Sequence, residues 1–331
     1  MNTLRNIIST VCLSLVLAAG AQASVVSFRI TGTPDDIPVS LSLRGVGTSD
    51  PRSAVNIAAP DDRGLYSATI QPDPSSLYYV YIYNSEANFQ TQMPMYLPGS
   101  VLSAGTPVDL SVRDGVLLHC DIADAPNRDI YDCAVNFLRQ SRSMSDWAKS
   151  SDPEVLLSHL RTYTAVADSA LSTSPVPPQV ADFVRLWSYS MASDAFRMVM
   201  HLRNRADLST PISSSDFLPD PKKVLDNDMA LSFGSTADNV ARTLSGTLPE
   251  KLAQLHADYT NAGVIGKVTD QLLSTYVRTY KYADGVQPGI DLLTDLESRY
   301  GISPKWAAQL RTTEATVPGN PFPAGVTLTD T

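Results

Sequence analysis

The stretch that decides the fold is residues 91–142, TQMPMYLPGSVLSAGTPVDLSVRDGVLLHCDIADAPNRDIYDCAVNFLRQSR. It contains a last strand-like run, Val116–Cys120, and the first clear helical pattern, which runs from Arg128 to Arg142. Apolar residues recur with period two before this crossing and with a period of about 3.6 after it. The sequence therefore predicts an α+β fold, in which an antiparallel β-sandwich or open barrel precedes an irregular all-α helical domain.

The predicted domains extend outward from this crossing. Residues 24–121 form the β domain, where short alternating runs are separated by turns rich in Gly, Pro and Asp. Residues 122–316 form the helical domain. We expect Asn127 to cap the N-terminus of its first helix and Gln179–Arg205, the longest and most apolar helix, to lie at the centre of a bundle.

Residues 1–23 have the features of a signal peptide. Arg5 supplies a positive charge, Ile7–Leu17 an apolar core, and Ala21-Gln22-Ala23 a small-residue cleavage motif. A retained membrane anchor is the alternative, but this apolar core is shorter than the roughly 20 residues that span a bilayer. The sequence predicts an exported, periplasmic protein without a transmembrane span after cleavage.

The charge and the motifs exclude several functions. The chain of 331 residues has a formal net charge of −9 and no lysine before Lys149, so it lacks the basic surface that nucleic acids require. The histidines beyond His119 stand alone on separate predicted helices, and strand alternation places His119 and Cys120 on opposite faces. Phosphate-binding and dinucleotide-binding glycine motifs are absent. We therefore predict no metal site, no cofactor and no catalytic residue.

Cys120 and Cys133 are the two cysteines that remain after signal cleavage. In an exported protein such a pair is commonly bonded, and a structural disulfide here would stabilise the fold by about 3 kcal/mol. The alternative is a pair of buried thiols, because Cys133 lies on the apolar face of its predicted helix. The pattern leaves both possibilities open, and the chain contains no Cys-x-x-Cys motif.

The run Leu77–Tyr83 is the most aromatic strand of the β domain. Its alternate residues Tyr79, Tyr81 and Tyr83 form a candidate platform for a ligand or a protein partner, since exposed aromatic rings bind sugars and bases. The alternative is a sandwich strand that is covered on both faces. On the predicted helices, Trp187 and Trp306 fall on apolar stripes and are expected in the core.

The order of these parts resembles one family. A signal peptide is followed by a β domain that opens with Phe28-Arg29-Ile30-Thr31-Gly32-Thr33, by the turn Met95-Tyr96-Leu97-Pro98-Gly99, and by helices. In this it resembles the exported bacterial thiol–disulfide oxidoreductases of the TlpA/ResA or AhpC/TSA (redoxin) type. In that family an N-terminal β domain of unknown function and a helical spacer often precede a thioredoxin-like domain.

The tail carries the rest of the resemblance. Residues 317–331 look like a linker and the entry strand of a thioredoxin-like domain, commonly APDFTLTD. Pro323-Ala324 and Thr327-Leu328-Thr329-Asp330 match this strand, whereas Gly325-Val326 replace the usual acid and aromatic residue. The resemblance places the active Cys-x-x-Cys beyond Thr331.

The resemblance thus implies a non-catalytic accessory or scaffold region of a periplasmic thiol–disulfide oxidoreductase. Its expected partners are its own thioredoxin-like domain and either a second copy of the chain or a protein substrate. The tyrosine strand and the acidic helices keep a different function open. This is a periplasmic or cell-surface binding module, chaperone-like or glycan-associated, with no enzymatic activity.

Overall fold

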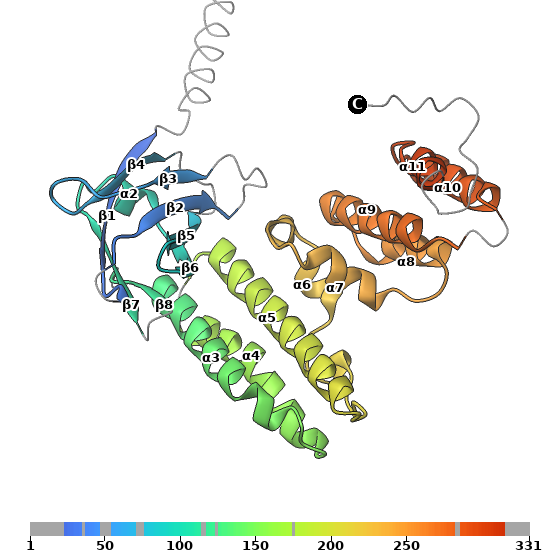
Figure 1. The fold of residues 1–331 in the computed structure, drawn as a ribbon, viewed down its shortest axis with the longest axis horizontal. Helices are drawn as coiled ribbons and strands as arrows, with labels where there is room; N and C mark the ends of the chain where they lie inside the picture. The colour runs from blue at the N-terminus through green and yellow to red at the C-terminus, as the bar shows by residue number, and fades with distance from the viewer. Residues whose placement is uncertain are drawn as a thin grey trace, which may run out of the picture. The chain divides into compact units, whose positions relative to one another are not determined.

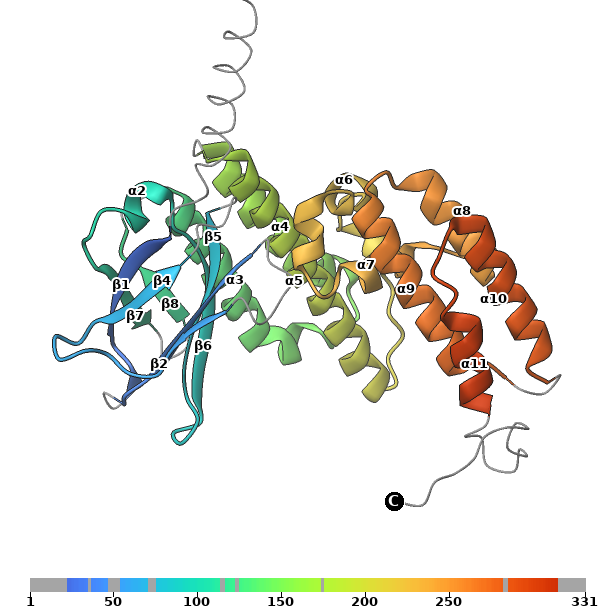
Figure 2. The same ribbon diagram turned by 90° about the horizontal axis from the view of Figure 1, so that it is seen from above.

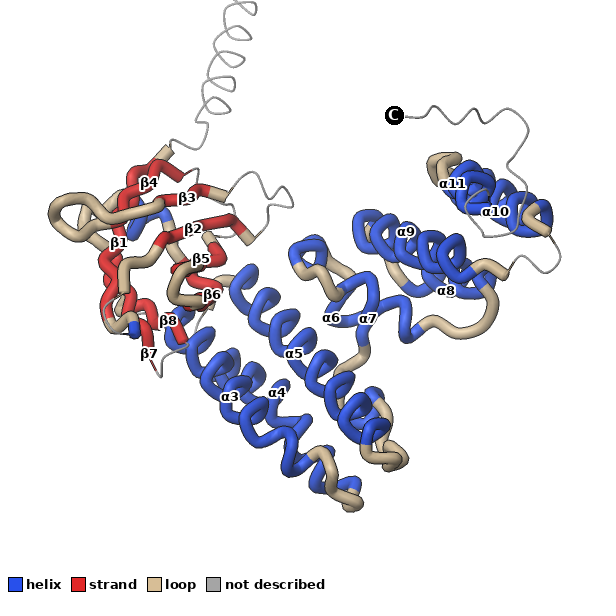
Figure 3. The backbone as a smooth tube through the Cα atoms, viewed as in Figure 1, coloured by secondary structure: helices blue, strands red, loops and turns tan. Residues whose placement is uncertain are grey.

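A computed structural model describes residues 23–34, 37–46, 54–70, 76–113, 117–122, 125–173, 176–281 and 285–314. The chain divides into two compact units, Met1–Pro219 and Asp220–Thr331, and each is considered by itself. Most of the predicted signal peptide, residues 1–22, and the whole of the predicted linker, residues 317–331, lie outside the described residues. The fold is α+β, with strands preceding helices (Figures 1 and 3).

The first unit begins with eight described strands in two sheets. They are β1 (Ser24–Thr31), β2 (Ser40–Gly45), β3 (Val55–Ile57), β4 (Tyr66–Ile70), β5 (Leu77–Asn84), β6 (Phe89–Tyr96), β7 (Val108–Arg113) and β8 (Leu117–Cys120). One sheet has the order β4-β1-β7-β8 and the other β3-β2-β5-β6, and they form separate layers (Figure 2). The sandwich prediction is confirmed.

The pairing of strands differs from the prediction at one place. β1 pairs with β7 in parallel, whereas every other pair among the described strands is antiparallel. The sequence pattern predicts that the turn at Pro98-Gly99 leads directly to the last strand, Val116–Cys120. The structure instead has a short helix, α2 (Gly99–Leu102), and then β7 between them. This longer connection lets β7 lie beside β1 in the same direction.

Alternation along the strands builds the core between the sheets. Phe28 of β1 and Leu110 of β7 are completely buried, as are Leu41, Val80 and Ile82 of the second sheet. Residues between them on the same strands face outward, as the period of two requires. The core therefore fixes which side chains of β5 reach the outer face, and these include the predicted tyrosines.

Three long helices complete the core of the first unit. They are α3 (Ala125–Trp147), α4 (Pro153–Thr173) and α5 (Pro178–Arg205), which pack against one another. Trp147, Leu160 and Val199 belong to their shared apolar core. These helices lie in the same compact unit as the sheets, so the division between the units falls after Pro219 and not near residue 121, where strands give way to helices.

The role of Asn127 was predicted incorrectly. Helix α3 already begins at Ala125, with Pro126 in its first turn, where the missing N–H of proline costs nothing. The side chain of Asn127 bonds the backbone of Tyr96 instead: Tyr96 N–H donates to Asn127 Oδ1 at 2.9 Å, and Asn127 Nδ2 donates to Tyr96 O at 2.8 Å. The amide thus replaces a neighbouring strand at the end of the edge strand β6.

Replacing Asn127 by alanine is expected to lower the free energy of unfolding by about 1–2 kcal/mol, because the partly buried N–H and carbonyl of Tyr96 each lose a partner. Asn204→Ala, at an exposed position of α5, is the matched control and should change stability by less than about 0.5 kcal/mol. Urea denaturation followed by circular dichroism measures both. Equal midpoints for the two variants would show that the edge of β6 needs no such partner.

The second unit is helical throughout the part that the structure describes. It contains α6 (Pro221–Leu225), the 3₁₀ turn η4 (Asp228–Ser232), α7 (Thr236–Thr243), α8 (Leu248–Asp258), α9 (Ala262–Thr279), α10 (Gln287–Tyr300) and α11 (Trp306–Glu314). Helix α9 contacts α7, α8 and α11. The buried Glu297 accepts hydrogen bonds from the N–H groups of Trp306 and Ala307 and so holds the start of α11.

Among the residues described, none of the helices combines the length and the apolar character that crossing a bilayer would need.

Candidate functional site

The two cysteines are buried thiols, and no disulfide joins them in this structure. Cys120 is 7% exposed and Cys133 is 8% exposed. Burial, together with the smaller effect of the nearby carboxylates of Asp129 and Asp132, raises the pKa of Cys133 to about 12. A thiol attacks as its thiolate, so Cys133 is a poor nucleophile at neutral pH. Of the two possibilities left open by the sequence, the structure has the pair of buried thiols.

Both thiols are therefore expected to resist alkylation in the native protein. At pH 8 a chain of residues 24–331 should incorporate iodoacetamide at Cys120 and Cys133 only in denaturant. Without denaturant, Cys133 should remain slow to react even at pH 10, because its pKa lies near 12. Mass spectrometry counts the alkylated cysteines, in samples with and without prior reduction. Two thiols that become reactive in denaturant only after reduction would reveal a disulfide and contradict the structure.

The predicted tyrosine platform is divided between a covered end and an open end. At the covered end, Phe183 of α5 contacts Tyr79 edge to face, with 6.2 Å between the ring centroids. The guanidinium of Arg44 lies 5.6 Å from the centroid of the same ring. Burial raises the pKa of Tyr79 to about 12, against a smaller lowering by Arg44. Tyr79 is thus part of the packing between sheet and helix.

At the open end, Tyr81 and Tyr83 are partly exposed. Their rings stack with 5.1 Å between the centroids and an angle of 19° between the ring planes. Tyr81 Oη donates a 2.7 Å hydrogen bond to Gln90 Oε1 of the neighbouring strand. Their cross-strand neighbours on the outer face are Ser40 and Ser42 of β2 and Gln90 and Gln92 of β6, and Asn56 of β3 lies opposite Ser42. We call these seven residues the tyrosine face: Ser40, Ser42, Asn56, Tyr81, Tyr83, Gln90 and Gln92.

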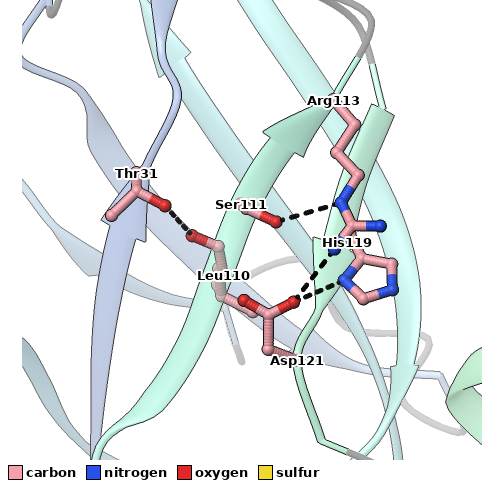
Figure 4. A network of polar contacts seen from close by, with 6 residues as sticks. All are labelled: Thr31, Leu110, Ser111, Arg113, His119 and Asp121. Carbon is pink, nitrogen blue, oxygen red and sulfur yellow. Dashed lines mark hydrogen bonds and ion pairs between the residues drawn. The ribbon is translucent and has the colours of Figure 1, made fainter.

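A second group of polar residues was missed from the sequence. Asp121 Oδ1 accepts a 2.7 Å hydrogen bond from Nδ1 of His119 and a 3.3 Å bond from the guanidinium of Arg113 (Figure 4). The His119 ring meets Tyr131 of α3 edge to face at 4.6 Å, and Arg113 lies 5.8 Å from the centroid of the same ring. The cluster thereby joins β7, β8 and α3.

This cluster includes the residue types of a Ser–His–Asp triad, because Ser111 lies opposite His119 across the strands. The geometry differs from that of a triad. The second ring nitrogen of His119 points away from Ser111 (Figure 4), and the Ser111 hydroxyl accepts a long 3.4 Å hydrogen bond from Arg113. A general base has to reach the proton it removes. The cluster therefore acts as a polar contact between the sheet and α3.

Part of this cluster could have been found from the sequence. His119 and Asp121 are two residues apart, so alternation places them on one face of a strand, with Cys120 on the other. The structure shows this separation, since Cys120 is buried while His119 binds Asp121 outside the core. Arg113 and Tyr131 come from other elements, and only the register of β7 with β8 and the packing of α3 bring them there.

The tryptophans expected in the core differ from each other. Trp306 is 7% exposed, whereas Trp187 is only partly buried and stacks on Phe183 with 6.0 Å between centroids.

No three of the described His, Cys, Asp and Glu side chains converge to hold a metal ion.

Comparisons of the chain with protein-family models, with curated proteins and with solved structures find no match.

Proposed function

We propose that this chain is a non-catalytic accessory region of an exported thiol–disulfide oxidoreductase. The observation that supports a non-catalytic role is the state of its cysteines, which are buried and of which Cys133 has a pKa near 12. The redox part of the proposal rests on the resemblance of residues 28–33, 95–99 and 323–330 to that family. In this proposal the chain positions a thioredoxin-like domain, a second copy or a protein substrate in the periplasm.

Two measurements test this proposal. The gene sequence after the codon for Thr331 should encode a domain with Cys-x-x-Cys, and the purified full product should reduce insulin disulfides in the presence of dithiothreitol. The mature chain alone, residues 24–331, should not accelerate that reduction above the rate with dithiothreitol by itself. A gene without Cys-x-x-Cys after this codon would remove the redox assignment.

The tyrosine face favours a second candidate function, a binding module. Tyr81 and Tyr83 are partly exposed, and the amides of Asn56, Gln90 and Gln92 are exposed beside them. Aromatic rings with hydroxyl and amide groups are the usual lining of small-molecule sites. Tyr79 of the predicted platform does not belong to this face, because Phe183 covers its ring. A binding role is tested by ligand-observed NMR on the mature chain, in which Tyr81→Ala should weaken a contact that Tyr300→Ala leaves intact.

A further inference from the structure

We infer that the tyrosine face binds an uncharged carbohydrate. This inference rests on the second candidate function, the binding module, and adds the chemical class of its ligand. Three properties of the face support it: the absence of charge among its seven members, its size, and the combination of stacked rings with groups that both donate and accept hydrogen bonds.

The charge of the face selects against ionic ligands. None of its seven members is an acid or a base. The charged residue that follows Ser42 on the same face of β2, Arg44, lies over Tyr79 at the covered end. Phosphates and carboxylates are recognised by arginine or lysine, and nucleic acids need several such contacts. An uncharged ligand needs no ionic partner, so the lack of charged residues on this face does not weaken its binding.

The size of the face selects against a large partner. One row, Asn56–Ser42–Tyr81–Gln92, crosses four strands, and the other, Ser40–Tyr83–Gln90, crosses three. With strands about 4.8 Å apart and alternate residues about 7 Å apart, these rows cover an area on the order of 150 Å². A stable protein–protein interface buries about 800 Å² on each partner. The face therefore fits a few sugar rings better than it fits a protein.

The chemistry of the face matches that of a sugar. A sugar hydroxyl both donates and accepts hydrogen bonds, and so do the hydroxyl of Ser42 and the primary amides of Asn56, Gln90 and Gln92, whereas the hydroxyl of Ser40 donates to Ala58 O and can only accept from a ligand. The C–H groups of a sugar ring are weakly positive and pack on the negative face of an aromatic ring. The bond from Tyr81 to Gln90 and the stacking on Tyr83 hold both rings in place before binding, which reduces the entropy cost of binding.

The test is titration of the mature chain with neutral hexasaccharides of glucose, xylose, mannose and N-acetylglucosamine, followed by calorimetry and saturation-transfer NMR. Oligogalacturonate of the same length is the charged comparison. We expect at least one neutral series to bind, and oligogalacturonate not to bind. Tyr81→Ala and Tyr83→Ala should each weaken binding roughly three- to tenfold, and Tyr81→Phe, which retains the ring, should weaken it less. Tyr300→Ala, at a partly exposed tyrosine of the second unit, should have no effect.

Circular dichroism of each variant separates a lost contact from a lost fold. Absence of binding to every neutral series, preferential binding of oligogalacturonate, or unchanged affinity in both alanine variants would overturn the carbohydrate assignment. A photo-crosslinking amino acid at position 83 then shows whether only the carbohydrate assignment fails or the binding module fails as well. If it captures a defined protein from the periplasm, the binding module stands with a different ligand. If it captures nothing, the binding module falls as well.

Discussion

Replacing Arg203 by alanine is expected to lower the free energy of unfolding of this chain by about 3 kcal/mol. Arg203 lies near the end of α5, is 3% exposed, and directs its guanidinium toward backbone carbonyls. It donates to Ala148 O at 2.9 Å, to Ser150 O at 2.6 Å and, through Nε, to Ser209 O at 2.8 Å. Alanine removes all of these donors at once.

The loss is large because these carbonyls belong to two connections. Ala148 and Ser150 follow α3, and Ser209 follows α5, so one guanidinium fixes both segments against the helices. An unsatisfied buried carbonyl costs about 1–3 kcal/mol. Lysine carries a single ammonium group and cannot present the same planar set of donors, so Arg203→Lys should recover only part of the loss.

Urea denaturation of a chain of residues 24–331 measures the effect, with Arg205→Ala as the matched control. Arg205 is two residues further along the same helix and is exposed, so its removal should change stability by less than about 0.5 kcal/mol. If the two variants unfold at the same urea concentration, the carbonyls do not depend on Arg203.

Arg203 also illustrates what the sequence can and cannot predict. The hydrogen bonds of a helix join residues close in the sequence, so the local pattern predicted α5 to within one residue at its start. A threonine followed three residues later by a glutamate, as in Thr247 and Glu250, is a local signal for the start of a helix, and the structure has a capping box there, at the N-terminus of α8, in which each side chain bonds the backbone N–H of the other residue. By contrast, nothing near Arg203 in the sequence distinguishes a buried guanidinium from an exposed one, because its acceptors lie in other segments.

The strands show the same limit. Val108, Leu110 and Val112 alternate and could have predicted β7, but its parallel pairing with β1 depends on contacts far along the chain. Asn127 has the residue type of a helix cap and is used for an edge strand instead. Local preference sets the options for such residues, and long-range packing selects among them.

For the candidate site, alternation correctly placed Tyr79, Tyr81 and Tyr83 on one face of β5. It could not show that this face is covered at Tyr79 and open at Tyr81 and Tyr83. The cover comes from Phe183, which belongs to a helix more distant in the sequence. The apolar character of Phe183 is typical of a buried residue, but periodicity does not predict which surface this residue contacts.

The second large effect is expected at this covering residue. Phe183 is fully buried and packs between Tyr79 of β5 and Trp187 of its own helix. Phe183→Ala should lower the free energy of unfolding by about 3–5 kcal/mol, because it removes buried surface and leaves a cavity. Phe89→Ala, at a partly buried position of β6, is the control and should cost much less. Chemical denaturation compares the two.

The same variant tests how the sheet face is divided. The pKa of Tyr79 is raised to about 12 mainly by burial, so removal of the Phe183 ring should move it down toward the ordinary tyrosine value. Ultraviolet absorbance of tyrosinate during an alkaline titration detects this shift, with Tyr79→Phe in the same background to assign it. If stability falls and the pKa of Tyr79 remains near 12, other residues cover that end. If both fall, the phenyl ring of Phe183 is what covers Tyr79 and leaves Tyr81 and Tyr83 available to a ligand.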